Sequence, residues 1–152
     1  MLSDNELINK AFLFASEKHQ GQTYNDGEYI QHPLLTYEIL TKISPEDINL
    51  RTAGLLHDLS EDQGVTKETL QKEFNEDVAD LVIQVSKDEN KNFPITSYRG
   101  LILKVADRLA NVSNYQTLPP ERRAKLFNKY ANGFVYEGSN LKVRNIVTEK
   151  IK

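Results

Sequence analysis

The residues best suited to chemistry form a short acidic cluster that contains one histidine: His57, Asp58, Glu61 and Asp62. On a helix of about 3.6 residues per turn, the first two positions neighbour the last two, so the four side chains share one arc. Apolar residues flank the cluster from Leu50 to Leu59, which is typical of a buried helix. Ionisable side chains in such a helix need a partner, and a divalent metal ion is a common one. The cluster therefore predicts a bound cation.

Two simpler interpretations of this cluster stay open, a buried ion pair and a frayed helix end that is exposed to solvent. Adjacent residues on a helix do not face each other, so His57 and Asp58 pair poorly, although both can contact a single ion. The two further carboxylates one turn later leave negative charge uncompensated. That charge favours the metal over the ion pair.

The chain holds only two other histidines, His19 and His32. His32 precedes Pro33 at a predicted junction of loop and helix, and this dipeptide alone is more typical of a helix cap or a surface histidine. His19 follows the apolar stripe of the first predicted helix, so we expect it at the edge of the core or hydrogen-bonded at the helix C-terminus. We do not predict that His19 is a metal ligand.

A second acidic candidate, Asp107, lies inside the apolar run 101–112 and needs a partner there. Lys104, three residues earlier, can supply a structural ion pair, and residue chemistry leaves the ion pair and the metal ligand equally open. Asn111 follows one turn later and projects from the same face.

Two histidines and two aspartates would form a nitrogen and oxygen donor set suited to Mn²⁺, Fe²⁺ or Zn²⁺. Such an ion can bind a phosphoryl oxygen and acidify a bound water, which Glu61 and Asp62 would orient and deprotonate. The sequence contains no P-loop, dinucleotide-binding fingerprint, HExxH or G-x-S-x-G motif. Metal-dependent phosphoryl chemistry is therefore the activity that these residues favour.

Composition limits the other possibilities. The chain has 152 residues, a net charge of −3 and no cysteine. The charge argues against a nucleic-acid-binding surface, and the missing cysteines exclude disulfides and thiolate metal sites. An acidic N-terminus and the absence of a long apolar stretch argue against a signal peptide and a membrane span. We expect a soluble cytoplasmic protein with no membrane or nucleic-acid partner, and its oligomeric state stays open.

The hydrophobic pattern is helical almost throughout. Ser3 and Glu6 predict a capping box that opens the first helix, and Ser44-Pro45 predicts the start of the helix that carries His57. Further helices are predicted to begin near Pro33, Thr66, Asn75, residue 101 and Pro119-Pro120, with a terminal helix over 136–152 and polar loops over 21–27 and 87–96. The prediction is a single all-α domain, residues 1–152, built as a bundle of roughly six to eight helices.

These residues occur in an order that resembles a known family. The chain resembles the HD-domain metal phosphohydrolases, and more closely the hydrolase domain of the RelA/SpoT-type alarmone enzymes and their small stand-alone relatives. The matching stretches are residues 15–22, 29–33, 54–62, 65–66 and 104–111, within a motif-bearing part of about 5–130. A lone His-Asp pair is a weak signal, but this ordered set is specific.

The resemblance implies a compact HD-domain helical bundle with one Mn²⁺ ion. It implies that this ion is held by His32, His57, Asp58 and Asp107. It also implies Glu61 and Asp62 as the catalytic pair that activates water, and Asn111 as a neighbour of the nucleotide. Members of the family remove pyrophosphate from the 3′ position of guanosine tetra- and pentaphosphate, (p)ppGpp, which leaves GDP or GTP. The implied partner is therefore a small nucleotide.

One loop departs from the family pattern. Relatives commonly carry an Arg-Lys pair after the Gly-Gln step, which packs on the base and its phosphates, whereas this chain has Thr23–Gly27. Tyr24 can still stack on a base, and with Asn25 it is our candidate for substrate contact. The positive charges of the family loop are missing. Candidates for phosphate contact elsewhere are Arg108, Lys87 and Lys104, although each is explained as simply by a solvated surface charge.

Three hypotheses follow for function. The first is a Mn²⁺-dependent (p)ppGpp 3′-pyrophosphohydrolase, and the second is the same chemistry on another nucleotide such as ppApp. The third, a non-catalytic nucleotide-sensing module, is disfavoured because all six site residues are present. Residues 131–152 match no motif and form a C-terminal extension of unknown role, and we expect no synthetase or regulatory domain.

Overall fold

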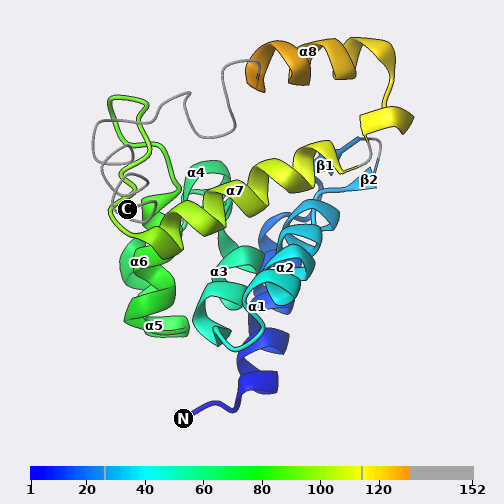
Figure 1. The fold of residues 1–152 in the computed structure, drawn as a ribbon. Helices are drawn as coiled ribbons and strands as arrows, with labels where there is room; N and C mark the ends of the chain where they lie inside the picture. Colours follow the sequence, from blue (N-terminus) through cyan, green and yellow to red (C-terminus); the bar gives the residue numbers. More distant parts are fainter. Residues whose placement is uncertain (26, 114, 131–152) are drawn as a thin grey trace.

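The computed structural model describes residues 1–25, 27–113 and 115–130. This part of the chain forms eight α-helices, one short 3₁₀ helix and a two-stranded hairpin (Figure 1). The elements are α1 (Asp4–Lys18), β1 (Thr23–Tyr24), β2 (Gly27–Glu28), α2 (Gln31–Ile43), α3 (Ile48–Leu56), α4 (Leu59–Gln63), α5 (Lys67–Glu73), α6 (Glu76–Gln84), α7 (Tyr98–Val112), η1 (Tyr115–Thr117) and α8 (Pro120–Tyr130). The predicted all-α bundle is confirmed.

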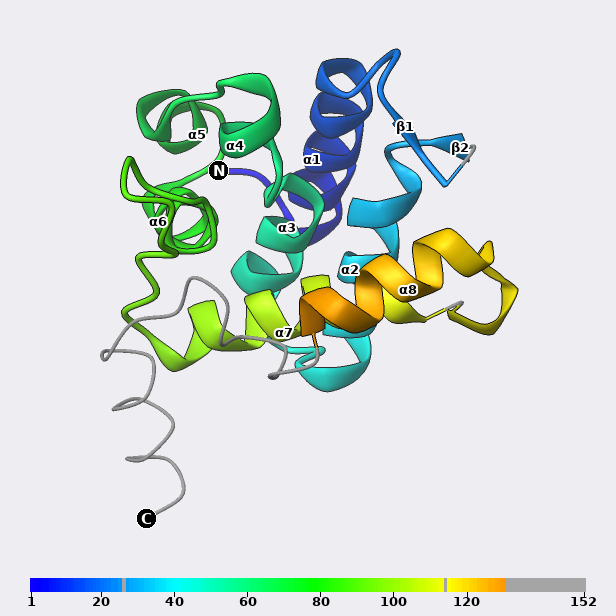
Figure 2. The ribbon, with the colours of Figure 1, turned by 90° about the horizontal axis from the view of Figure 1, so that it is seen from above.

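Helix α3 lies at the centre of the bundle, where α1, α2, α6 and α7 pack around it (Figures 1 and 2). Its apolar residues point nearly all round the helix, and six of its nine residues are buried. Gly54 lets α2 approach closely, because a Cβ there would lie 2.7 Å from Leu40 Cδ1 and 3.3 Å from Tyr37 Cα. This close approach allows the imidazole rings of His32 and His57 to meet, with centroids 5.2 Å apart.

Side-chain caps begin several helices where the sequence predicts them. Ser3 Oγ accepts a hydrogen bond from the Glu6 backbone N–H and donates one to the Glu6 carboxylate. Thr66 and Asn75 cap α5 and α6 in the same way. Such caps satisfy backbone N–H groups that have no partner inside the helix, so they act locally and can be recognised in sequence.

The helix predicted to carry the whole acidic cluster is in fact interrupted at the His-Asp pair. Helix α3 ends at Leu56, and α4 begins at Leu59. The His57 imidazole Nδ1 is 2.7 Å from the Gly54 carbonyl oxygen, and Asp58 has φ −93° and ψ −5°. The His57 side chain thus bonds to a carbonyl oxygen that a backbone N–H one turn later would otherwise bond in a continuous helix. This competition accounts for the break. The prediction that all four side chains share one helical arc is therefore wrong.

Two further boundaries differ from the sequence prediction. Helix α3 begins at Ile48 under an Asp47 cap, whereas Ser44 ends α2. The predicted polar loop 21–27 contains β1, which pairs antiparallel with β2. The terminal helix predicted over 136–152 lies outside the described residues. Among the described helices, none is long and apolar enough to cross a membrane.

Candidate active site

Three separate parts of the fold bring four side chains to one point: His32 from the first turn of α2, His57 and Asp58 from the α3–α4 break, and Asp107 from α7. His32 Nε2 lies 2.8 Å from Asp107 Oδ1 and 3.5 Å from Asp58 Oδ2. His57 Nε2 lies 3.2 Å and 3.1 Å from the same two oxygens. One ligand atom from each residue lies within 4.8 Å of all the others, a spacing that a single ion can bridge.

The hydrogen bonds of this cluster show which side of each histidine faces the carboxylates. Because a carbonyl can only accept, the Gly54 oxygen requires His57 to carry its proton on Nδ1. In neutral His57 the lone pair on Nε2 then faces the two carboxylates, an arrangement that a proton or a metal must compensate. Burial opposes protonation, but Asp58 and Asp107 outweigh it and raise the pKa of His57 well above its usual value. The cluster of two histidines and two aspartates is consistent with a divalent metal site.

Asp107 combines the two roles that its sequence position left open. Its Oδ1 faces the two histidines, while its Oδ2 lies 3.1 Å from the Lys104 ammonium. Lys104 is itself buried, and its ammonium lies 3.7 Å from the centre of the Phe93 ring. Burial opposes ionisation of Asp107, yet hydrogen bonds from the histidines and the charge of Lys104 hold its pKa well below its usual value. The carboxylate is therefore ionised and available to a cation at neutral pH.

Tyr29 is a site residue that the sequence analysis missed. Its hydroxyl donates a 2.6 Å hydrogen bond to Asp58 Oδ2. Burial and the negative charge of Asp58 raise the pKa of Tyr29, so it stays a donor. For Asp58, burial opposes ionisation, but the neighbouring His57 outweighs it and lowers the pKa to about 2. The sequence shows a tyrosine three residues before His32. It does not show that this tyrosine contacts Asp58, because that contact forms only in the folded protein.

A cavity of about 270 Å³ opens beside the cluster, and Glu61 and Asp62 line it. Glu61 Oε1 accepts a 3.1 Å hydrogen bond from the Lys87 backbone N–H. Asp62 Oδ2 accepts a 3.2 Å hydrogen bond from the Gln22 side-chain amide. Both carboxylates are exposed. They are therefore accessible to a molecule in the cavity.

Positive side chains also line this cavity: Lys87, Lys104, Arg108, Arg122 and Lys129. Lys104 and Arg108 are only 5% and 3% exposed, so their explanation as solvated surface charges is wrong. Arg122 and Lys129 come from α8 and were not predicted, because nothing in the sequence indicates that α8 contributes to this cavity. The cavity offers both carboxylates for proton transfer and cations for a phosphorylated ligand.

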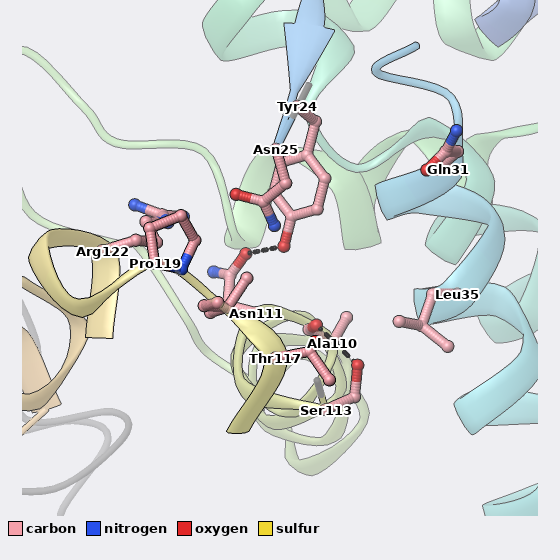
Figure 3. Close-up of a pocket in the computed structure, with 11 residues that line it drawn as sticks. Tyr24, Asn25, Gln31, Leu35, Ala110, Asn111, Ser113, Thr117, Pro119 and Arg122 are labelled. Atoms are coloured by element: carbon pink, nitrogen blue, oxygen red, sulfur yellow. Dashed lines mark hydrogen bonds between the residues drawn. The ribbon is translucent and has the colours of Figure 1, made fainter. Parts of the chain in front are cut away.

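A second cavity of about 680 Å³ adjoins the first. Figure 3 shows the residues that line it. Tyr24, Asn111 and Arg122 line both cavities. The Tyr24 hydroxyl donates a 3.0 Å hydrogen bond to Asn111 Oδ1, and its ring centre lies 4.9 Å from that of His32. Asn25 also lines the larger cavity and has a left-handed backbone, with φ 48°. Of the predicted substrate-contact residues, Tyr24, Asn25 and Asn111 line this larger cavity, whereas Arg108 lines only the smaller one.

Comparison with known proteins identifies the family. The HD domain family matches residues 11–97. The chain belongs to the HD-domain family. A Mycobacterium leprae protein described as a probable GTP pyrophosphokinase is 37% identical over 135 residues, which cover 78% of this chain. A Vibrio cholerae guanosine-3′,5′-bis(diphosphate) 3′-pyrophosphohydrolase is 30% identical over 162 residues, which cover 95% of this chain.

A solved structure matches this chain over nearly the full length of both proteins. It is described as a metazoan orthologue of SpoT that hydrolyses ppGpp, and it superimposes with a TM-score of 0.71 at 25% identity over 95% of both chains. In contrast, this HD-domain chain spans only 17% and 23% of the lengths of the Mycobacterium and Vibrio relatives. The chain is thus an HD domain related to the (p)ppGpp hydrolase domain of RelA/SpoT proteins.

Proposed function

We propose that this HD-domain protein is a Mn²⁺-dependent (p)ppGpp 3′-pyrophosphohydrolase. The observation that carries the proposal is the cluster of His32, His57, Asp58 and Asp107 beside a cation-lined cavity that also holds Glu61 and Asp62. The relatives described as ppGpp hydrolases support the choice of substrate class.

The proposed roles divide the acidic cluster in two. His32, His57, Asp58 and Asp107 would hold the ion, which when bound would supply positive charge for a phosphoryl oxygen and acidify a water. Glu61 and Asp62 orient that water and accept its proton. The water oxygen bonds to the phosphorus next to the ribose 3′ oxygen, and the bond between that phosphorus and the 3′ oxygen breaks. The 3′ oxygen takes up the proton that these carboxylates accepted, and pyrophosphate and GDP or GTP are released.

The two cavities suggest how the substrate lies. The smaller one, with its lysines and arginines, suits the 3′ pyrophosphate, and the larger one suits the nucleoside. Tyr24 and Asn111 would then contact the ribose between them. Lys104 and Arg108 on α7 and Arg122 on α8 supply the positive charge that the loop 23–27 lacks.

Hydrolysis assays test this proposal directly. Purified protein with Mn²⁺ should convert ppGpp to GDP and pyrophosphate. Glu61→Ala should lower kcat by about 100-fold or more, because it removes a group that handles the proton. Asp58→Ala should abolish both metal binding and turnover, whereas Glu38→Ala, an exposed residue on α2, should change neither. Metal loading without turnover of ppGpp would contradict the proposed substrate and leave the metal site intact.

The larger cavity also motivates an alternative substrate. Its polar lining includes the neutral side chains of Gln31 and Ser113, which can hydrogen-bond to either purine. Competition of ppGpp against ppApp and simple nucleotides would separate the two substrates. Metal-dependent turnover of any nucleotide would exclude a purely sensing role.

A further inference from the structure

Behind the proposed catalytic carboxylate Asp62 lies a chain of side chains that starts at a buried histidine. His19 ends α1, is only 2% exposed and lies apart from the metal cluster. Its Nδ1 lies 2.9 Å from Gln22 Oε1, and Gln22 Nε2 donates a 3.2 Å hydrogen bond to Asp62 Oδ2. Gln63 adds a second donor to the same Gln22 oxygen, at 2.7 Å.

The chemistry of these groups allows one direction for the hydrogen bonds. A carboxylate only accepts, so the NH₂ group of Gln22 must face Asp62 and its oxygen must face His19. His19 must therefore carry a proton on Nδ1. In neutral His19 the other nitrogen, Nε2, is an acceptor beside a cavity of about 190 Å³ that Ser16 also lines. Asp62 thus determines, through Gln22, which tautomer a buried imidazole adopts.

A tight backbone turn from His19 to Gln22 brings the two side chains together. The Gln22 backbone N–H bonds to the His19 carbonyl at 2.9 Å, which closes a tight turn. Gly21 within it has φ +87°, a conformation that residues with a Cβ rarely adopt. The Tyr29 ring packs on the His19 ring with centroids 4.5 Å apart, and its hydroxyl reaches Asp58. One buried imidazole therefore supports a side chain directed at each of Asp58 and Asp62.

We propose that His19 and Gln22 are positioning residues that hold Asp62 in one orientation toward the reacting water. The proposal rests on the catalytic role proposed above for Asp62. Asp62 is exposed, and the bond from Gln22 restricts the rotamers that its side chain adopts. Loss of the Gln22 bond should lower turnover while binding of metal and nucleotide continues, because neither residue belongs to the metal cluster.

The kinetic test replaces the amide with a side chain of similar length. Gln22→Met should lower kcat for ppGpp about 10-fold, because a misoriented general base loses part of its roughly 100-fold or larger contribution. KM and the Kd for Mn²⁺ should change less than twofold. His19→Asn, which keeps a donor near the Nδ1 position, should retain more kcat than His19→Leu. Gln20→Met, an exposed residue of the same turn, is the matched control. A Gln22→Met enzyme with unchanged kcat, or with its loss confined to metal affinity, would overturn the proposal.

Nuclear magnetic resonance tests the same network without substrate. The nitrogen shifts of neutral His19 in the wild-type protein should show the proton on Nδ1, against the preference of free histidine for Nε2. Gln22→Met should shift the tautomer toward Nε2. A wild-type His19 protonated on Nε2 would overturn the proposal. A wild-type protein that turns over no nucleotide but shows the Nδ1 tautomer would contradict the proposed function and leave the hydrogen-bond network established.

Discussion

At the scale of single residues, each aspartate of the cluster has one further partner: Lys104 bonds to the Asp107 oxygen that faces away from the histidines, whereas Tyr29 bonds to Asp58 Oδ2, the oxygen that faces them. The hydrogen bond from the Tyr29 hydroxyl is 2.6 Å long. Partners of this kind fix the orientation of a ligand, and their loss costs about 10–100-fold in metal affinity or activity. We therefore expect metal affinity to depend on Tyr29 and Lys104 as well as on the four residues of the cluster.

Tyr29→Phe isolates this effect because it removes one hydroxyl and keeps the ring packed on His19. We expect the Kd for Mn²⁺ to rise about 10-fold, measured by titration calorimetry at pH 7. Tyr98→Phe, an exposed tyrosine at the start of α7, serves as the control and should not change the Kd. Equal affinities of Tyr29→Phe and wild type would show that Asp58 needs no support from Tyr29.

At the scale of elements, Arg99 joins three helices that frame the site. From α7 it bonds to Asp47, the N-cap of α3, and to Asp77 in the first turn of α6, at 2.8–2.9 Å. Its hydrogen bonds lower the pKa of both carboxyls below the usual value of 3.8. All three side chains are partly exposed, so solvent screens the pairs, and we expect them to contribute about 1 kcal/mol together.

This network predicts a stability difference that depends on pH. A carboxyl whose pKa is lower in the folded state stabilises the fold above its unfolded pKa, and that contribution is lost as the pH falls through the folded pKa. Arg99→Ala should therefore be less stable than wild type by about 1 kcal/mol at pH 7, and the difference should shrink as the pH falls below about 4. Urea unfolding of both proteins at several pH values measures it. Lys67→Ala, which breaks an exposed 3.8 Å pair with Asp80, should show a smaller difference. A difference for Arg99→Ala that is constant with pH would contradict the assignment.

How far the sequence predicts these elements depends on the range of the interactions. The caps at Ser3, Thr66 and Asn75 act within one turn, and the helices they start were predicted. The break at His57 depends on a side chain that bonds a carbonyl, and the hairpin at Tyr24 has strands of only two residues. Neither the break nor the hairpin produces a periodic pattern of hydrophobic residues that could be recognised in the sequence.

In the candidate site, too, the sequence predicted what depends on local chemistry and missed what depends on distant contacts. Residue chemistry alone predicted a cation at His57-Asp58 and left Asp107 open between ligand and ion pair. The ordered motifs added His32, which lies 75 residues from its partner Asp107. No local pattern predicted Tyr29, Gln22 or Arg122, because their roles arise only when distant segments pack together.

At the scale of the whole molecule, the metal cluster links the stability of the fold to its ligand. The four residues come from α2, the α3–α4 break and α7, so an ion that bridges them ties together segments that separate on unfolding. Mn²⁺ at about 100 times its Kd should stabilise the folded state by about 2.7 kcal/mol. For a chain of this size, that corresponds to a rise in Tm of about 5–10 °C.

Thermal melts with and without Mn²⁺ test this link without any substrate. Excess EDTA should reverse the rise in Tm, and His32→Asn should abolish it, because the remaining residues no longer surround the ion. Glu61→Ala should keep the full rise, since its carboxylate is proposed to act on water and not on the metal. Equal Mn²⁺ stabilisation of wild type and His32→Asn would place the ion elsewhere, and loss of the rise in Glu61→Ala would make Glu61 a ligand. The melts therefore separate the residues that hold the metal from the one that handles the proton.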